Sequence, residues 1–154
     1  MNKEISLVDD QVVIRYTLRN TGDESFETNE YAHNFFGINH ETVNENYQLT
    51  LPNMNHIDVA VGTIKQQKQQ LTWPIVPNGD FYAQIDINEE NASYNWELYH
   101  TQIKAGVRDL TSFTPEKMAL WGRDHVVSPE VFIAIALSSG ETKTWERRYQ
   151  FYRN

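Results

Sequence analysis

His33 is the histidine whose sequence context best suits acid–base chemistry. It lies in the segment EYAHNFFGIN, residues 30–39, among aromatic residues and directly before Asn34. An imidazole exchanges protons near neutral pH, and a setting of this kind holds it in a fixed orientation at a partly dry site. The residues alone leave two interpretations open: a general acid or base, or a hydrogen-bonded histidine at the end of a strand.

Glu130 is the second candidate for acid–base chemistry. It stands at the start of the most apolar stretch of the chain, within VVSPEVFI at residues 126–133, and Pro129 fixes the backbone immediately before it. A buried carboxylate costs free energy unless it is paired or has a task. This position therefore indicates either a functional group or an exposed glutamate at the entry to a strand.

Four other residues are candidate contacts for a sugar. Phe35 and Trp121 carry flat rings that can cover the apolar face of a pyranose, although a core position is the simpler explanation of any one aromatic residue. Asn34 is the polar neighbour of His33. Asp124 forms with His125 either a pair of ligands or a turn, and the turn is the favoured interpretation.

The sequence lacks the motifs of several common kinds of site. The chain has no cysteine, which excludes disulfides, a thiolate nucleophile and a cysteine-based zinc site. None of the five histidines forms an i, i+4 pair or an HExxH motif, no serine lies in a GxSxG elbow, and the seven glycines are scattered singly. We therefore expect no metal and no other cofactor.

The charge of the chain disfavours nucleic acid as a partner. The sequence has 21 acidic and 13 basic residues, and its formal net charge of -8 repels phosphate backbones. The N-terminal residues MNKEISLVDD lack the apolar region of a secretory signal, and no apolar run is long enough to span a bilayer. The expected location is cytoplasmic, without membrane contact.

Strands must position these candidates, because alternation of polar and apolar residues dominates the chain. Strands are predicted over residues 11–19, 80–87, 94–100, 131–137 and 142–152. The stretch 131–137 is apolar on both faces, as in a central strand, and turn signals separate the runs. The best helical candidate is a single turn at residues 115–120. The pattern predicts an all-β antiparallel sandwich, in one domain over residues 1–154.

The segments around both candidates resemble those of the aldose 1-epimerase, or galactose mutarotase-like, family. YTLRNTG at residues 16–22 is similar to the family's L-x-N-T-G strand and turn, and His33 stands before aromatic residues as the family's histidine does. Residues 128–133 resemble the strand that brings in the catalytic glutamate, and residues 140–149 resemble the closing strand. The resemblance covers nearly the whole chain and implies a galactose mutarotase-like supersandwich.

The resemblance also implies roles for the two candidates. In that family the histidine protonates the ring oxygen of the sugar, and the glutamate takes the proton from the C1 hydroxyl. The ring opens and recloses as the other anomer. Carried over, His33 is the acid and Glu130 the base of an aldose 1-epimerase type of reaction. The implied partner is a small-molecule sugar.

The chain departs from the family pattern in its length. The family's domain is larger, and too few residues precede His33 to supply its N-terminal sugar contacts. The resemblance therefore concerns the C-terminal part of the supersandwich. A non-catalytic carbohydrate-binding module and a truncated, inactive relative are the alternatives to an enzyme. Because uncovered strand edges tend to pair, a homo-oligomer that completes the sheets is a further expectation.

Overall fold

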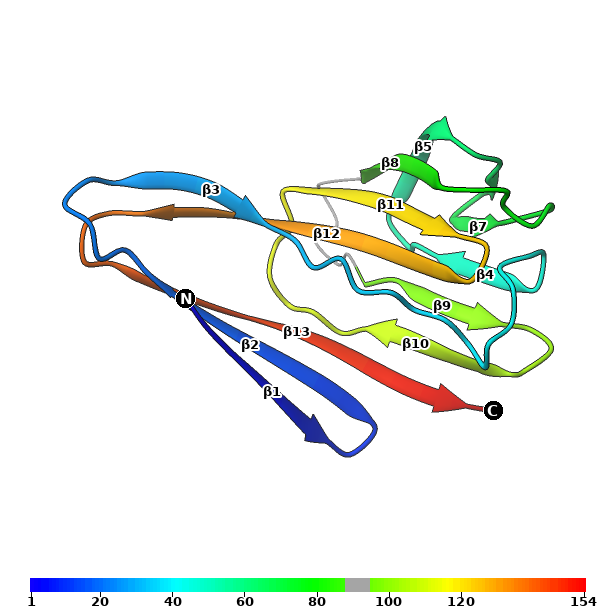
Figure 1. The fold of residues 1–154 in the computed structure, drawn as a ribbon, viewed down its shortest axis with the longest axis horizontal. Coiled ribbons are helices and arrows are strands. Elements are labelled where there is room, and N and C mark those ends of the chain that lie inside the picture. Colours follow the sequence, from blue (N-terminus) through cyan, green and yellow to red (C-terminus); the bar gives the residue numbers. More distant parts are fainter. Residues whose placement is uncertain (88–94) are drawn as a thin grey trace.

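The computed structural model of the chain describes residues 1–87 and 95–154, and their regular secondary structure is entirely β-strand (Figure 1). The strands pair antiparallel in two sheets, which confirms the predicted antiparallel β-sandwich. Within the described ranges, no helix is long and apolar enough to cross a membrane.

The larger sheet contains eight strands and carries both ends of the chain. Its order is β1 (Asn2–Val8), β2 (Gln11–Arg19), β13 (Thr142–Arg153), β10 (Ala105–Asp109), β9 (Glu97–His100), β4 (Tyr47–Thr50), β7 (Gln70–Thr72) and β6 (Lys65–Gln67). The first and the last long strands of the sequence are therefore direct neighbours, with Trp145 of β13 opposite Tyr16 of β2.

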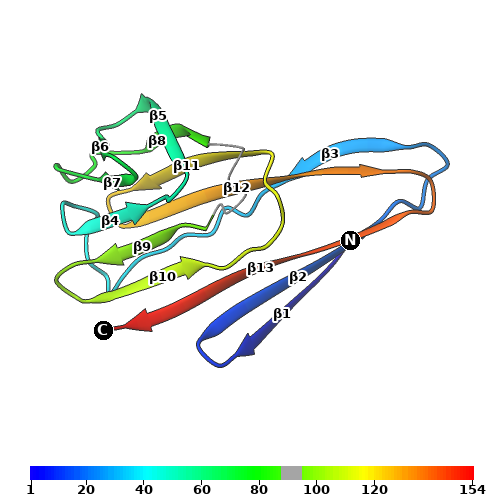
Figure 2. The same cartoon turned by 180° about the vertical axis from the view of Figure 1, so that it is seen from behind.

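The smaller sheet contains five strands and positions the candidate residues. Its order is β3 (Phe26–Glu30), β12 (Val126–Leu137), β11 (Lys117–Arg123), β8 (Phe81–Ile87) and β5 (Met54–Val61). Figures 1 and 2 show this sheet lying over the larger one. The pairs β3–β12 and β2–β13 extend beyond the shared region and meet at the turn between β12 and β13.

Apolar side chains from both sheets form one core between them. Phe81, Leu120 and Val127 of the smaller sheet and Leu49 and Leu98 of the larger sheet are fully buried. Each buried side chain of this size contributes about 1.5–3 kcal/mol through removal of apolar surface from water. In β2, β8 and β13 the alternating pattern read from the sequence places the buried side chains on the face toward this core.

The predicted strands are present, with two corrections to their extent. The stretch 131–137 belongs to a longer strand, since β12 already begins at Val126. β12 lies between β3 and β11, but β11 pairs with Val126–Phe132 and β3 pairs with Ile133–Leu137. Burial alternates over 131–137 and Ala134 and Ala136 are exposed, so the expected burial of both faces is wrong for this stretch. The strand predicted over 94–100 begins only at Glu97, because Asn95 and Trp96 are not part of a strand, and Tyr94 lies outside the described residues.

The helical turn predicted at residues 115–120 is wrong. Lys117–Arg123 form the strand β11, in which Met118 and Leu120 face the core while Ala119 and Trp121 face the other way. Six residues are too few to separate a helical period from the two-residue period of a strand. Pairing with β8 and β12 decides between them.

Candidate functional site

The site is built on the face of the smaller sheet that points away from the core. In β12 the side chains of Val127 and Val131 face the core, so Ser128, Glu130 and Phe132 face the opposite side. In the neighbouring strand β11, Trp121 pairs with Ser128 and therefore shares this outer face.

A break in the pairing of β3 with β12 carries the candidate histidine. The ladder ends at Glu30 opposite Ile133, and a single bridge re-forms it at Phe36 opposite Val127. Six positions separate the paired residues on both chains, so the register is unchanged across the break. His33 consequently lies opposite Glu130.

Residue 129 contributes to this break. The N–H and C=O of Val127 both bond to Phe36, and these groups alternate sides along a strand. The backbone of Pro129 therefore faces the same way, toward residues 31–35, but proline has no N–H to donate. None of the backbone hydrogen bonds between described residues joins residues 31–35 to β12. The backbone hydrogen bonds of the described residues therefore do not tie the His33 segment to β12.

His33 and Glu130 are in direct contact. Nε2 of His33 lies 3.1 Å from Oε1 of Glu130, and their side chains are 38% and 6% exposed. Burial raises the pKa of Glu130 above its usual range, and the nearby imidazole opposes this by favouring the ionised carboxylate. The pair thus combines an accessible imidazole with a largely buried carboxyl group.

Aromatic rings surround the imidazole on this face. Trp121 meets His33 edge-on with ring centroids 4.9 Å apart, and Phe35 does so at 4.8 Å. Tyr31 stacks on Phe132 at 4.3 Å on the other side of the pair. Phe35 is 60% exposed and Tyr31 is 43% exposed, so apolar ring surface is open to solvent beside the polar pair.

The sequence reasoning missed three members of this face: Tyr31, Ser128 and Phe132. The signal that would have found them is the two-residue period on either side of His33 and Glu130. Ser128 is fully buried, and its Oγ has no hydrogen-bond partner among the described residues. An unsatisfied hydroxyl therefore lies next to Glu130 on the same face of β12.

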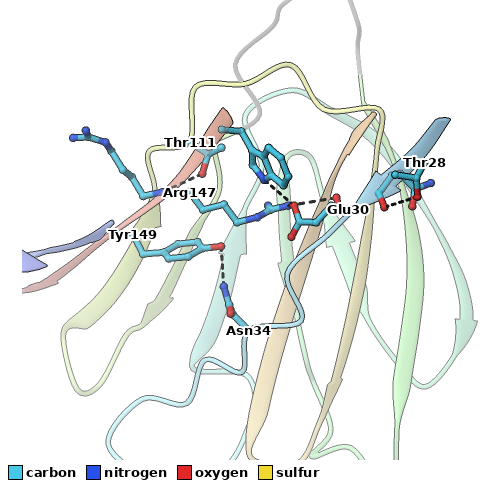
Figure 3. A network of polar contacts seen from close by, with 9 residues as sticks. Thr28, Glu30, Asn34, Thr111, Arg147 and Tyr149 are labelled. Carbon is cyan, nitrogen blue, oxygen red and sulfur yellow. Dashed lines mark hydrogen bonds and ion pairs between the residues drawn. The ribbon is translucent and has the colours of Figure 1, made fainter. Parts of the chain in front are cut away.

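The structure does not bring Asn34 and Asp124 to the pair. Asn34 points toward the core side, where its Nδ2 donates to the hydroxyl of Tyr149 at 2.9 Å (Figure 3). Asp124 lies in the turn between β11 and β12, and its Oδ1 is 2.6 Å from Nδ1 of the adjacent His125. Asp124 and His125 form a turn, as the sequence analysis favoured.

The cationic groups near the site in sequence are engaged elsewhere. Arg123 pairs with Asp80 at 3.0 Å, and Arg108 pairs with Glu97 at 2.6 Å in the larger sheet. A cleft of about 1070 Å³ lies elsewhere and is lined by residues of β1, β2, β12 and β13 and of the connection at residues 112–116. His33 and Glu130 are not among the residues that line this cleft, and we favour their face as the candidate site because of its chemistry.

The described residues contain no group of three or more His, Cys, Asp or Glu side chains placed to hold a metal ion. The donors at the site are one imidazole and one carboxylate. This pair is suited to moving protons between itself and a ligand held against the rings.

Solved structures of similar fold come from galactose mutarotase-like proteins. A galactose mutarotase related enzyme from Lactobacillus acidophilus superimposes with a TM-score of 0.67 over 97% of this chain, at 11% identity. A galactose mutarotase-like protein from Lactobacillus casei gives 0.64 over 96% of the chain, at 15% identity. A candidate aldose 1-epimerase from Escherichia coli gives 0.68 over 99%, at 12% identity.

These neighbours share the fold of this chain at low sequence identity, and the similarity covers only part of each neighbour's length. The chain spans 60%, 61% and 60% of the lengths of these three proteins. No protein-family model matches the sequence, and no curated protein matches it at a significant level. On the evidence of its two sheets and these neighbours, the chain has the galactose mutarotase-like fold.

Proposed function

We propose that the chain binds a pyranose on the outer face of the smaller sheet and interconverts its anomers through His33 and Glu130. The observation that carries the proposal is the 3.1 Å contact between an exposed imidazole and a buried carboxyl group within a wall of aromatic rings. The neighbours of similar fold, described as galactose mutarotase related or as a candidate aldose 1-epimerase, support the same chemistry.

The spacing of the pair suits the atoms of the reaction. The ring oxygen and the C1 hydroxyl of a pyranose are bonded to the same carbon, so the acid and the base must lie close together. Glu130 as carboxylate takes the proton of the C1 hydroxyl while His33 as imidazolium protonates the ring oxygen. The bond between C1 and the ring oxygen breaks, and C1 becomes an aldehyde. Rotation about the bond between C1 and C2 and the reverse transfers then give the other anomer.

The environment of each group fits its role. The raised pKa of Glu130 makes its carboxylate a stronger base than a solvated glutamate, because burial disfavours the charged form. The partial exposure of His33 leaves its ring accessible to the ligand. Phe35 and Trp121 supply ring surface for the C–H face of the sugar, an interaction of the kind that aromatic side chains offer to apolar surfaces.

The positions of the nearby cationic side chains bear on the choice of sugar. Arg108 and Arg123 each pair with a carboxylate away from His33, and a phosphate would need such groups for charge-assisted hydrogen bonds. Lys117, in contrast, lies on the same outer face, with its Nζ 4.6 Å from the centre of the Phe132 ring, so neutral aldoses and sugar phosphates are both tested as substrates.

The test is exchange between anomers, followed by NMR on a panel of neutral aldoses and their phosphates. Loss of a general acid or base typically costs 10²–10⁴-fold in rate, so His33→Ala and Glu130→Gln should each reduce the catalysed rate by about 100-fold or more. His56→Ala is the matched control, because His56 forms an exposed contact with Asp86 at 3.2 Å outside the aromatic wall. Exchange by the wild-type chain that never exceeds the uncatalysed rate would contradict the proposal.

A sugar-binding module without catalysis is the second candidate function. It is favoured by the exposed rings of Phe35 and Tyr31, which can contact a sugar without any proton transfer. A thermal-shift screen with monosaccharides separates the two candidates. A ligand at 100 times its Kd stabilises the fold by about 2.7 kcal/mol whether or not anomer exchange is accelerated.

A further inference from the structure

The geometry points to Arg147 and Tyr149 of β13 as positioning residues, which hold the His33 segment in place from the opposite sheet. The segment of residues 31–35 has no backbone ladder to β12, so its position depends on side-chain contacts. The side chains alternate along it. Tyr31, His33 and Phe35 face outward, whereas Glu30 and Asn34 face the core side and reach β13.

The first anchor is the carboxylate of Glu30, three residues before His33. An NH2 group of Arg147 donates to Oε2 of Glu30 at 2.7 Å, and the indole N–H of Trp145 donates to the same oxygen at 3.0 Å. Arg147 is 2% exposed and lies over the ring of Phe113 at 5.0 Å. A charge-assisted bond in this buried setting fixes the position of its acceptor more firmly than a solvated pair does.

The second anchor is Asn34, the residue directly after His33. Its amide donates to the hydroxyl of Tyr149 at 2.9 Å, and Tyr149 itself is buried against the rings of Phe36 and Trp96. Figure 3 shows Arg147 and Tyr149 reaching from β13 toward Glu30 and Asn34. The two anchors bracket His33 and therefore set how far its ring lies from Glu130.

Through these two anchors, buried polar side chains of β13 affect the geometry of the candidate site. Arg147 and Tyr149 contact neither the imidazole ring nor Glu130 through any described interaction, so they act through the segment. Their assignment as positioning residues for the reaction rests on the proposed function. Their effect on the His33–Glu130 contact is a property of the chain without a sugar and can be measured without turnover.

The primary test is Tyr149→Phe, which removes one hydroxyl and keeps the ring. NMR of the His33 ring nitrogens across a pH titration reports its contact with Glu130. We expect a shifted titration midpoint in Tyr149→Phe and, where the chain catalyses exchange, a kcat about tenfold lower with a smaller change in KM. Tyr152→Phe is the matched control, because its hydroxyl bonds to Glu97 at 2.5 Å from the same strand, away from the segment.

A second set of variants tests the Glu30 anchor without leaving an unpaired buried charge. The double variant Glu30→Gln/Arg147→Met removes both charges, and Arg147→Lys keeps the charge but loses the planar fork. We expect a shifted His33 titration in the double variant and a smaller shift in Arg147→Lys. A His33 titration identical to wild type in folded Tyr149→Phe and in the folded double variant would overturn the inference. Inactivity of the wild-type chain with shifted titrations would instead refute only the proposed function.

Discussion

At the scale of single residues, the raised pKa of Glu130 should make the stability of the fold depend on pH. The residue is 5% exposed, and burial raises its pKa in the folded chain above the value of about 4.3 expected when unfolded. Below the unfolded-state pKa the carboxyl group is neutral in both states and costs nothing. As the pH rises through the folded-state pKa, the native chain must ionise a buried group and loses stability.

Glu130→Gln should therefore stabilise the fold at neutral pH while it removes the proposed base. The glutamine side chain keeps the shape without the charge, and a gain of about 1 kcal/mol would raise Tm by about 2–4 °C in a chain of this size. Calorimetry should show this gain at pH 7 and its disappearance near pH 4. The exposed Glu45 supplies the control variant Glu45→Gln. An unchanged or lower Tm at pH 7 would contradict the raised pKa.

Phe35 should matter for binding and hardly at all for stability. Its ring is 60% exposed, so Phe35→Ala changes a surface position and should move Tm by no more than about 2 °C. Loss of a stacking surface worth about 0.5–1.5 kcal/mol should weaken sugar binding up to about tenfold. Titration calorimetry with the best sugar of the panel measures this, and Phe151→Ala, 46% exposed on β13, is the control. Equal affinity in wild type and Phe35→Ala would show that the ring is not a sugar contact.

At the scale of secondary-structure elements, the break between β3 and β12 defines the site. The strands keep one register on both sides of the break, and Pro129 faces it without a donor. A segment whose backbone has no ladder opens more readily than the strands around it. We therefore expect the backbone of the His33 segment to open more readily than the paired strands on either side of it.

Hydrogen exchange should detect this difference along the chain. The amides of Ala32 and Asn34 face β12 without a backbone partner there, whereas the amides of Phe36 and Val127 exchange bonds at 3.0 Å. We expect the first two to exchange about 100-fold faster than the second two, because exchange from a paired amide requires opening of the sheet. Equal protection of all four amides would mean that the ladder is closed in solution.

The sequence supports the strands better than it supports the site. Period-two alternation was sufficient for β2, β8 and β13, because each buries one face. The pairing of His33 with Glu130 came from resemblance, since no local pattern gives the register between segments about 100 residues apart. The inward direction of Asn34 depends on the same register, so it could not be read from its neighbours. The error at residues 115–120 came from a window too short to carry a period.

At the scale of the whole molecule, the larger sheet ends in an uncovered strand. All seven residues of β1 are exposed, including Ile5 at 64% and Leu7 at 79%. These two side chains lie opposite Ile14 and Val12, on the face of the sheet that elsewhere packs on the core. Exposed apolar residues on a strand with a free edge favour pairing with another strand.

The homo-oligomer expected from the sequence remains a prediction, and we propose that β1 is its contact. Light scattering should show a species larger than 18.0 kDa that Leu7→Lys converts to monomer, because a buried lysine charge opposes strand pairing. Ile75→Lys, at an equally uncovered apolar residue outside β1, should leave the assembly intact. A wild-type chain that stays monomeric at about 10 mg/ml would count against this contact. It would mean that β1 remains uncovered in solution.

The central claim is that His33 and Glu130 act together on one sugar, and a double-variant cycle in the anomer-exchange assay tests it most directly. Groups that act as a unit are strongly non-additive, so His33→Ala/Glu130→Gln should lose about as much rate as either single variant. That result, with exchange by the wild-type chain well above the uncatalysed rate, is the one we predict. Single-variant losses that multiply in the double variant would show that the two groups act independently, and a wild-type rate equal to the uncatalysed one would remove the enzyme proposal altogether.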